Sequence, residues 1–400
     1  MYEKRNEYDF TIETLNSVKS KLDDRFATKL KSKRVFLAID GFIDSLYSLI
    51  KSRKSLEDYK KFSTIKEFAD RLYTIAGSSG NIELYLKKKT SGGFVPNNGK
   101  ALSSLGVNLF LLGALGYPKI KKVFSPLINK SNVDISSIAN PGKTIGLEFS
   151  DGKIMLSDFK GLYEISWDTI KSRIKTDILI EELEHSDAIG FGYWSLTSSM
   201  TKIWKKFSKE VFPSLSNLNK KFFFIDLADV KKRSTFDILE MLDVVKRLED
   251  KIPILMSLND QEAIDISKAL DEIPSIDPKK ENFKDFISAG KNINNELNLS
   301  YLVIHSPHFA TISLKNDEGH YWITEGYTAH PSFTVSAGDH FLSGVVAGLL
   351  GGLTPQEAIL VGNALTAIFV RIGRSPKFNE LTEFISKYIH YIDQDDPKFP

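Results

Sequence analysis

The sequence predicts an α/β fold in which a mostly parallel sheet is covered by helices on both faces. Short apolar runs in the second half of the chain are each followed by a helical or polar segment, an alternation typical of parallel sheets. Hydrophobic residues make up 42% of the 400 positions, which is enough for a sizeable core. No fixed-period repeat or Pro-rich linker divides the chain, and this favours a single domain. The strand candidates in this half are DAIGFGYW, KFFFIDLA, IPILMSLN and YLVIHS.

Charge and cysteine content exclude several classes of function. The 53 Lys and Arg residues nearly balance the 51 Asp and Glu residues, so neither nucleic acid nor a membrane surface is expected as a partner. The chain has no cysteine, which excludes disulfides, thiolate nucleophiles and cysteine-ligated zinc. Its start, MYEKRNEYDF, is charged and lacks the apolar centre of a secretory signal. We therefore expect a soluble cytoplasmic protein.

The chain is predicted to begin with a helical extension over residues 1–33. Apolar side chains recur there at the spacing of one helix face, and they are Phe10, Leu15, Val18, Leu22 and Phe26. The apolar run RVFLAID then reads as a buried strand. It opens a single domain that we expect to span residues 34–390.

The segments that follow predict a smaller β appendage. IKEFADRLYTIAG is typical of a helix ended by Gly77, and NIELYLKKK alternates weakly, as a strand does. In KTIGLEFSDGKIMLSDF, two alternating runs flank the Asp151-Gly152 pair, which is a strong hairpin signal. We expect this hairpin to be an antiparallel appendage and not a further parallel strand.

The stretch TVSAGDHFLSG, residues 334–344, predicts an anion site at the start of a helix. The first N–H groups of a helix lack partners and carry partial positive charge, and small residues let an anion approach them. The amides of Ala337, Gly338 and Asp339 could therefore face one anion. A carboxylate at that place makes sense if Asp339 accepts a proton from a hydroxyl that attacks a phosphoryl group. The alternative is that Asp339 only caps the helix and the small residues only allow tight packing.

This stretch resembles the second signature of the ribokinase-like (PfkB) carbohydrate kinases, Asp-Thr-x-Gly-Ala-Gly-Asp-x-Phe-x-x-Gly. Six positions match: Thr334, Ala337, Gly338, Asp339, Phe341 and Gly344. Phe333 stands in place of the Asp, and Ser336 in place of the first Gly. The resemblance implies a ribokinase-like fold with a small β-sheet lid. It also implies that Asp339 is the base, that the backbone of residues 337–339 forms the anion hole, that Ser336 belongs to the same catalytic loop and that Thr334 lies beside the nucleotide.

Two further stretches resemble the acceptor side of these kinases. TSGGFVPNNGKALSSLG is similar to their first signature, which implies that Gly92, Gly93 and Asn97 contact the sugar. AIDGFIDSLYSL resembles their first strand and the turn after it, where an Asp holds two hydroxyls of the acceptor. Asp44 is the candidate for that role by position, and Asp40 is the second choice.

The nucleotide side shows weaker resemblance. LMSLNDQEA is similar to the family's Asn-x-x-Glu motif, which implies that Asn259 orients water or phosphate and that Glu262 holds Mg²⁺ through water. The alternative is an ordinary helix start. FFFIDLADVKKR resembles the family's Asp-x-Asn-x-Arg segment and makes Asp226 a second metal candidate, while Asn363 is a candidate contact to the nucleotide base.

The resemblance implies an ATP- and Mg²⁺-dependent kinase that phosphorylates a hydroxyl of a sugar or sugar-like molecule. Lid segments are expected near residues 81–93 and 143–160, with a possible homodimer contact through the lid. Two alternatives stay open: a nucleoside kinase, and a non-catalytic binding or regulatory protein on a kinase scaffold. The second is favoured by the two departures above, by Tyr117-Pro118 where the family has an acidic residue, and by HSPHFA where it commonly has Thr-x-Gly-x-x-Gly. His305 and His308 lack the partner spacing of a metal site.

Overall fold

The computed structural model describes residues 2–277, 282–324 and 326–390. Its centre is a nine-stranded sheet that runs parallel from β6 to β12 and ends in two antiparallel strands. The predicted fold class is confirmed. The strands, from one edge to the other, are β14 (His320–Thr324), β13 (Phe309–Leu314), β12 (Tyr301–His305), β11 (Ile254–Asn259), β10 (Phe222–Asp226), β9 (Ala188–Gly192), β1 (Arg34–Ala38), β5 (Asn108–Gly113) and β6 (Val133–Ser137).

Helices cover both faces of this sheet, because alternate strand residues point to opposite sides. In β1, Phe36 belongs to one buried cluster, while Val35 and Leu37 belong to the other. The first cluster is covered by α7 (Trp167–Arg173), α8 (Thr176–Glu184), α9 (Met200–Lys206), α10 (Thr235–Glu249), α11 (Asp260–Ala269) and α12 (Phe283–Leu297). The second is covered by α1 (Tyr2–Lys21), α2 (Asp24–Lys31), α4 (Phe94–Ser104), α13 (Ala337–Gly351), α14 (Pro355–Ile372) and α15 (Phe378–Tyr388).

The N-terminal extension consists of two helices and not one. Asp23 interrupts it, since its side chain accepts a hydrogen bond from the Phe26 amide at 2.9 Å and begins α2. Leu15, Val18 and Phe26 of the predicted apolar face are buried in the second cluster. Met1 lies outside the described residues. No helix in the described ranges combines the length and the apolar character that crossing a bilayer requires.

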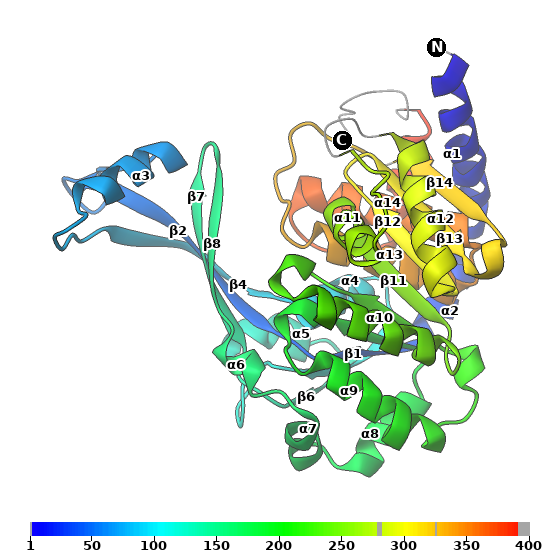
Figure 1. The fold of residues 1–400 in the computed structure, drawn as a ribbon. Helices are drawn as coiled ribbons and strands as arrows, with labels where there is room; N and C mark the ends of the chain where they lie inside the picture. Colours follow the sequence, from blue (N-terminus) through cyan, green and yellow to red (C-terminus); the bar gives the residue numbers. More distant parts are fainter. Residues whose placement is uncertain (1, 278–281, 325, 391–400) are drawn as a thin grey trace.

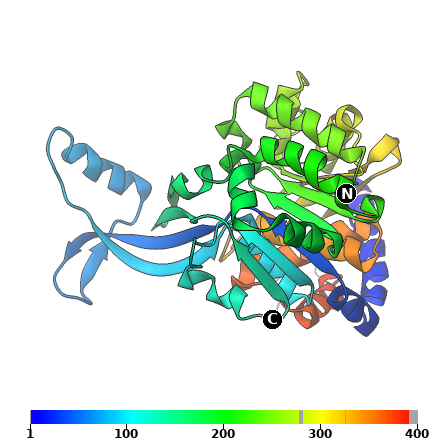
Figure 2. The same ribbon diagram turned by 90° about the horizontal axis from the view of Figure 1, so that it is seen from below.

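A five-stranded second sheet forms an arm that projects from the body (Figures 1 and 2). We call this arm, residues 42–92 and 142–158, the lid. Leu49, Phe62 and Leu147 form its small buried core. Its strands are β2 (Phe42–Arg53), β3 (Tyr59–Lys61), β4 (Glu83–Gly92), β7 (Gly142–Phe149) and β8 (Gly152–Asp158), and it also carries the helix α3 (Ile65–Thr74). The remaining short helices are α5 (Ser125–Ile128) and α6 (Lys160–Tyr163).

The lid extends further than the sequence predicts. The hairpin of β7 and β8 turns at Asp151-Gly152 as expected, with Phe149 paired to Gly152. However, the segment after the first strand is not a turn. It is the twelve-residue strand β2, which pairs with β4 on one edge and β7 on the other. The helix α3 ends at Thr74, before Gly77, and buries none of its residues. Polar residues interrupt the apolar pattern of β2, so its strand character depends on its partners in the lid.

Candidate active site

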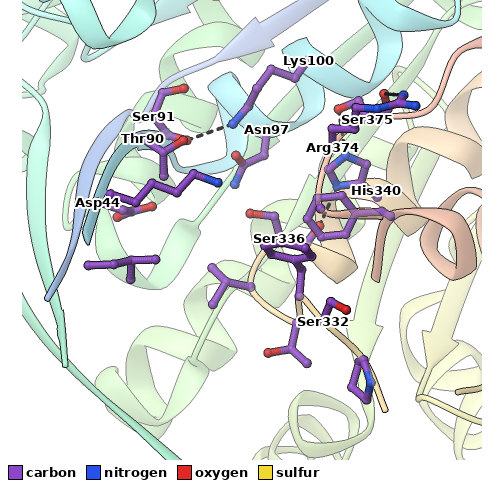
Figure 3. A pocket seen from close by; sticks show the side chains of 18 of the residues that line it. Asp44, Thr90, Ser91, Asn97, Lys100, Ser332, Ser336, His340, Arg374 and Ser375 are labelled. Carbon is purple, nitrogen blue, oxygen red and sulfur yellow. Dashed lines mark hydrogen bonds between the residues drawn. The ribbon is translucent and has the colours of Figure 1, made fainter. Parts of the chain in front are cut away.

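A cavity of ≈ 430 Å³ lies where the lid meets the carboxyl end of the main sheet. In open parallel sheets this edge is where ligands bind. Figure 3 shows Asp44, Thr90 and Ser91 on the lid side, Asn97 and Lys100 of α4 beside them, and Ser336 and His340 across the cavity. Segments far apart in the chain therefore meet around one space of the size of a small-molecule site.

Asp339 lies in the first turn of α13 and is 3% exposed. Its Oδ2 accepts hydrogen bonds from Asn97 Nδ2 at 2.9 Å and from the Tyr193 hydroxyl at 3.1 Å, and its Oδ1 accepts one from Asn98 Nδ2 at 3.2 Å. Burial, together with the negative charges of Asp226 and Asp40, raises the pKa of Asp339 well above its usual value. The result is a fixed carboxylate with a strong tendency to accept a proton.

Tyr193 and Asn98 were missed by the sequence analysis. Asn98 is fully buried and also accepts a hydrogen bond from the Ser343 hydroxyl at 2.7 Å, which connects α4 to α13. Tyr193 follows β9 in the left-handed backbone region, with φ of 57°. The adjacent Asn pair near the start of α4 was the one available signal, because a buried amide needs polar partners.

The backbone before Asp339 forms a narrower anion site than predicted. The Ala337 N–H donates to the Thr334 carbonyl at 3.2 Å and is therefore engaged in a turn. Within the described chain no acceptor takes the N–H of Gly338 or of Asp339. Ser336, which lines the cavity, has φ of 75° and ψ of 12°, a left-handed conformation that costs a non-glycine residue roughly 1–2 kcal/mol. Gly338 and Asp339 are thus the amides available to an anion.

The segment HSPHFA forms the tight connection between β12 and β13. Ser306 Oγ accepts the amide of Phe309 at 3.2 Å within this turn. The His305 ring packs against Phe341 of α13, with ring centroids 4.5 Å apart, and it lies close to Gly338. Burial lowers the pKa of His305 to about 4, so the ring is neutral near pH 7. A neutral imidazole therefore borders the anion site where the family commonly has a Gly-rich turn.

The glycine pair before α4 makes room for two carboxylates. A Cβ on Gly92 would overlap Asp44 Oδ2, and a Cβ on Gly93, where φ is 95°, would lie 2.6 Å from Asp40 Oδ2. Asp44 lines the cavity from β2, and burial raises its pKa. An alanine at either position would push a carboxylate out of place.

Asp40, the second choice for the sugar ligand, is engaged by the backbone at the start of α4. It is fully buried, and its two oxygens accept the amides of Phe94 and Val95, each at 2.9 Å. Those amides begin α4 and would otherwise lack partners. Burial raises the pKa of Asp40 to about 7. Asp40 therefore anchors the helix that carries Asn97, and Asp44 is the carboxylate that faces the cavity.

Lys100 is a cation that the sequence analysis also missed. Its Nζ donates to the Ser91 carbonyl at 2.9 Å, at the cavity wall (Figure 3). Burial lowers its pKa to about 8, while the charges of Asp339 and Asp44 act in the opposite direction. A lysine inside a predicted helix is normally on the surface, so the sequence held no sign of this position.

Asn259 and Glu262 form a capping box at the start of α11. The Asn259 side chain accepts the Glu262 amide at 2.9 Å, and Glu262 Oε2 accepts the Asn259 amide at 3.0 Å. The helix-start alternative is thus present in the geometry. Burial and the charge of Asp226 nevertheless raise the pKa of Glu262 well above its usual value, and burial raises that of Asp226 to about 6. A buried carboxylate whose ionisation a second carboxylate opposes fits a neighbouring cation.

The number of acidic side chains near Glu262 determines how such a cation would be held. Among the described residues, no three acidic or histidine side chains gather closely enough to enclose a metal ion. Mg²⁺ usually keeps several waters and uses one or two carboxylates, so Glu262 and Asp226 fit it through water. The charge of Asp226 acts on both Asp339 and Glu262.

Thr334 and Asn363 complete the predicted residues. Thr334 lines the cavity next to Ser336. Asn363 is fully buried in α14, and its Nδ2 donates to the Thr324 carbonyl at 3.1 Å, at the end of β14. Its Oδ1 is buried and has no hydrogen-bond partner among the described residues, and the suggested base contact stays a prediction. Its amide stabilises the edge of the sheet.

Comparisons with solved structures agree with this architecture. Ribokinase from Arabidopsis thaliana, complexed with ribose and ATP, superposes with a TM-score of 0.60 at 14% identity over 88% of this chain and 98% of that chain. Ribokinase from Cryptococcus neoformans, in complex with ADP, gives 0.60 at 13% over the same shares. A nucleoside kinase from Methanocaldococcus jannaschii gives 0.56 at 14% over 89% and 98%. Identities this low show the ribokinase fold alone.

Sequence comparisons are more specific. A curated ketohexokinase from Haloferax volcanii is 28% identical over 386 residues, which cover 96% of this chain and 98% of that protein. The sequence model of the prokaryotic ketohexokinase family matches residues 10–388. The predicted carbohydrate kinase is thereby confirmed over the non-catalytic alternative. The chain belongs to the prokaryotic ketohexokinase family, and it is a sugar kinase that transfers phosphate from ATP to an alcohol group.

Proposed function

We propose that the protein transfers the γ-phosphoryl group of ATP to a hydroxyl of a ketohexose, with Asp339 as the catalytic base. The strongest support for this role is the set of groups that surrounds the Asp339 carboxylate. A buried carboxylate with raised pKa is fixed by three side-chain donors and adjoins two unpaired helix amides. Its partner Asn97 lines the cavity. These are the two parts that phosphoryl transfer needs: an oriented nucleophile and stabilised charge.

The residues divide the reaction between the lid and the body. Asp44 accepts hydrogen bonds from hydroxyls of the sugar, and the backbone at Gly93 and the Asn97 amide oxygen lie close to the same molecule. The acceptor oxygen attacks the γ-phosphorus as its proton passes to Asp339, and ADP leaves with the cleaved bond's electrons. The amides of Gly338 and Asp339 stabilise charge on the transferred group. Mg²⁺, held through water by Glu262 and Asp226, would neutralise charge on the phosphates.

The test is ADP release from Mg²⁺-ATP with a panel of acceptors. The panel contains four ketohexoses, their aldohexose counterparts, ribose, fructose 6-phosphate and adenosine. We expect turnover with at least one ketohexose and kcat/KM at least tenfold lower with every aldohexose. Preference for adenosine or for an aldohexose contradicts the proposal, and so does ATP hydrolysis that is independent of any acceptor.

A phosphorylated ketose is the second candidate acceptor. Four lysines line the cavity, and a fixed cation is the usual partner of a phosphate group. They are Lys88, Lys100, Lys130 and Lys153. In the same assay, fructose 6-phosphate with a lower KM than any free ketohexose would favour this candidate.

We also propose that two copies pair through the lid, and that the reaction takes place in the cytoplasm. The face of the lid turned away from the sugar has a second hollow, and Ile145 and Leu156 beside it are 37% and 53% exposed. Exposed apolar side chains of this kind mark interaction sites. Light scattering should give twice the chain mass of 45.1 kDa, and Ile145→Lys should halve it. A wild-type monomer at micromolar concentration contradicts the pairing.

A further inference from the structure

Ser336 has a backbone conformation that residues with a side chain rarely adopt. It lies at the start of the turn that orients the anion-site amides. With φ of 75°, it lies in the left-handed region that favours glycine. It directly precedes the turn that presents the Gly338 and Asp339 amides. If its backbone relaxed to φ below zero, those amides and the carboxylate of Asp339 would move together. Something must therefore hold Ser336 in place.

His340, four residues further along the chain, makes two hydrogen bonds to the carbonyl oxygen of Ser336. The backbone N–H of His340 donates to Ser336 O at 3.2 Å, and the ring Nδ1 lies 2.8 Å from the same oxygen. A carbonyl oxygen only accepts, so Nδ1 carries the proton. The other ring nitrogen, Nε2, then accepts a hydrogen bond from the Ser375 hydroxyl at 2.9 Å.

The ring itself is fixed by the next helix. It stacks on Phe369 of α14, with centroids 3.8 Å apart and an interplanar angle of 15°, and His340 is only 2% exposed. Burial lowers the pKa of His340 to about 4, which keeps the ring neutral. The ring lines the cavity, but both of its nitrogens already have partners. It is therefore placed to support the backbone and not to bind the sugar.

We propose that His340 is a positioning residue that maintains the left-handed conformation of Ser336 and so directs the anion-site amides and Asp339 at the reacting atoms. A chain with glycine at position 336 would need no such support. His340 compensates for the serine, and Ser375 and Phe369 hold His340 in turn. This inference rests on the proposed role of Asp339 in catalysis.

The test is a double-mutant cycle between positions 336 and 340. His340→Phe keeps the stacked ring and removes the donor, and small misplacements of this kind can cost about 10²-fold in rate. We expect His340→Phe to lower kcat by roughly that factor in the wild-type background, while KM for the sugar changes less than about threefold. In the Ser336→Gly background the same substitution should lower kcat only a few-fold. Equal losses in the two backgrounds overturn the proposal.

Two further variants keep the result interpretable. His340→Asn can place an amide N–H near Nδ1 and should recover part of the kcat lost in His340→Phe. His185→Phe, on an exposed residue at the end of α8, should leave kcat unchanged. Melting temperatures of the same four proteins test whether His340 supports Ser336, without an activity assay. Ser336→Gly should raise the melting temperature of the His340→Phe protein more than that of the wild type. If that coupling is found but no acceptor is phosphorylated, the proposed function fails, and only the support that His340 gives to the Ser336 backbone is established. If acceptors are phosphorylated and the coupling is absent, the inference fails alone.

Discussion

Asp339→Asn is expected to lower kcat by roughly 10²–10⁴-fold, the usual contribution of a positioned general base. Asparagine has nearly the same shape and can still accept a hydrogen bond from Asn97 or Tyr193, but it cannot take a proton from the acceptor. Sugar binding should therefore persist. The measurements are kcat by ADP release and the sugar Kd by calorimetry, which should change by less than about fivefold because the lost step belongs to the transition state.

Asp134→Asn is the matched control, because Asp134 is an exposed carboxylate at the start of β6 that pairs with Arg34. Its kcat should equal that of the wild type. If Asp339→Asn retains more than a tenth of the wild-type kcat, Asp339 is not the base. If it loses sugar binding as well, Asp339 is a binding residue.

Lys100→Met is expected to move the acid limb of the pH–rate profile to higher pH by about one unit, within the range that a nearby opposite charge produces. Lys100 faces both Asp44 and Asp339, and its charge favours the ionised form of each. Without it, both pKa values rise further, so a smaller fraction of Asp339 can act as base near pH 7. Methionine keeps the apolar stem in place. We expect kcat near neutral pH to fall about tenfold, because one pH unit is a tenfold change in ionised fraction.

The same residue predicts an alkaline limb. Because burial lowers the pKa of Lys100 to about 8, the ammonium loses its proton as the pH rises through that value, and the rate should fall there. Lys100→Arg should retain the acid limb and abolish the alkaline one, since arginine stays protonated. Lys202→Met, on an exposed face of α9, is the control for loss of one positive charge. An unchanged acid limb in Lys100→Met would show that the charge is not felt at the base.

The fold was largely predictable because its signals are local. The consecutive apolar residues of KFFFIDLA are enough to indicate a buried strand, and Asp151-Gly152 specifies a hairpin from two residues. The strand β2 was not predictable in this way. It is half polar and becomes a strand because β4 and β7 supply partners on both edges.

The site residues were predictable where a short motif fixes the backbone. They were not predictable where side chains from distant parts of the chain meet. The cavity side of Asp44 and the helix-start position of Asp339 follow from short stretches. The Tyr193 and Asn98 contacts to Asp339, and the position of Lys100 between two carboxylates, depend on the approach of α4 to α13 and β9. The Ala337 amide shows the opposite case, because this plausible anion ligand already donates to the Thr334 carbonyl.

The lid strand β2 has a consequence for how acceptor preference can change. Asp44, the proposed sugar ligand, belongs to the projecting arm, whereas Asp339 and its supporting donors belong to the body (Figure 1). The arm has its own small core around Leu49 and Leu147. In the proposed mechanism, part of acceptor selection therefore lies in the arm, while the chemistry lies in the body. Substitutions in the arm can alter which sugar is admitted while the transfer machinery stays intact, so new substrate ranges can evolve, or be engineered, without rebuilding the catalytic centre.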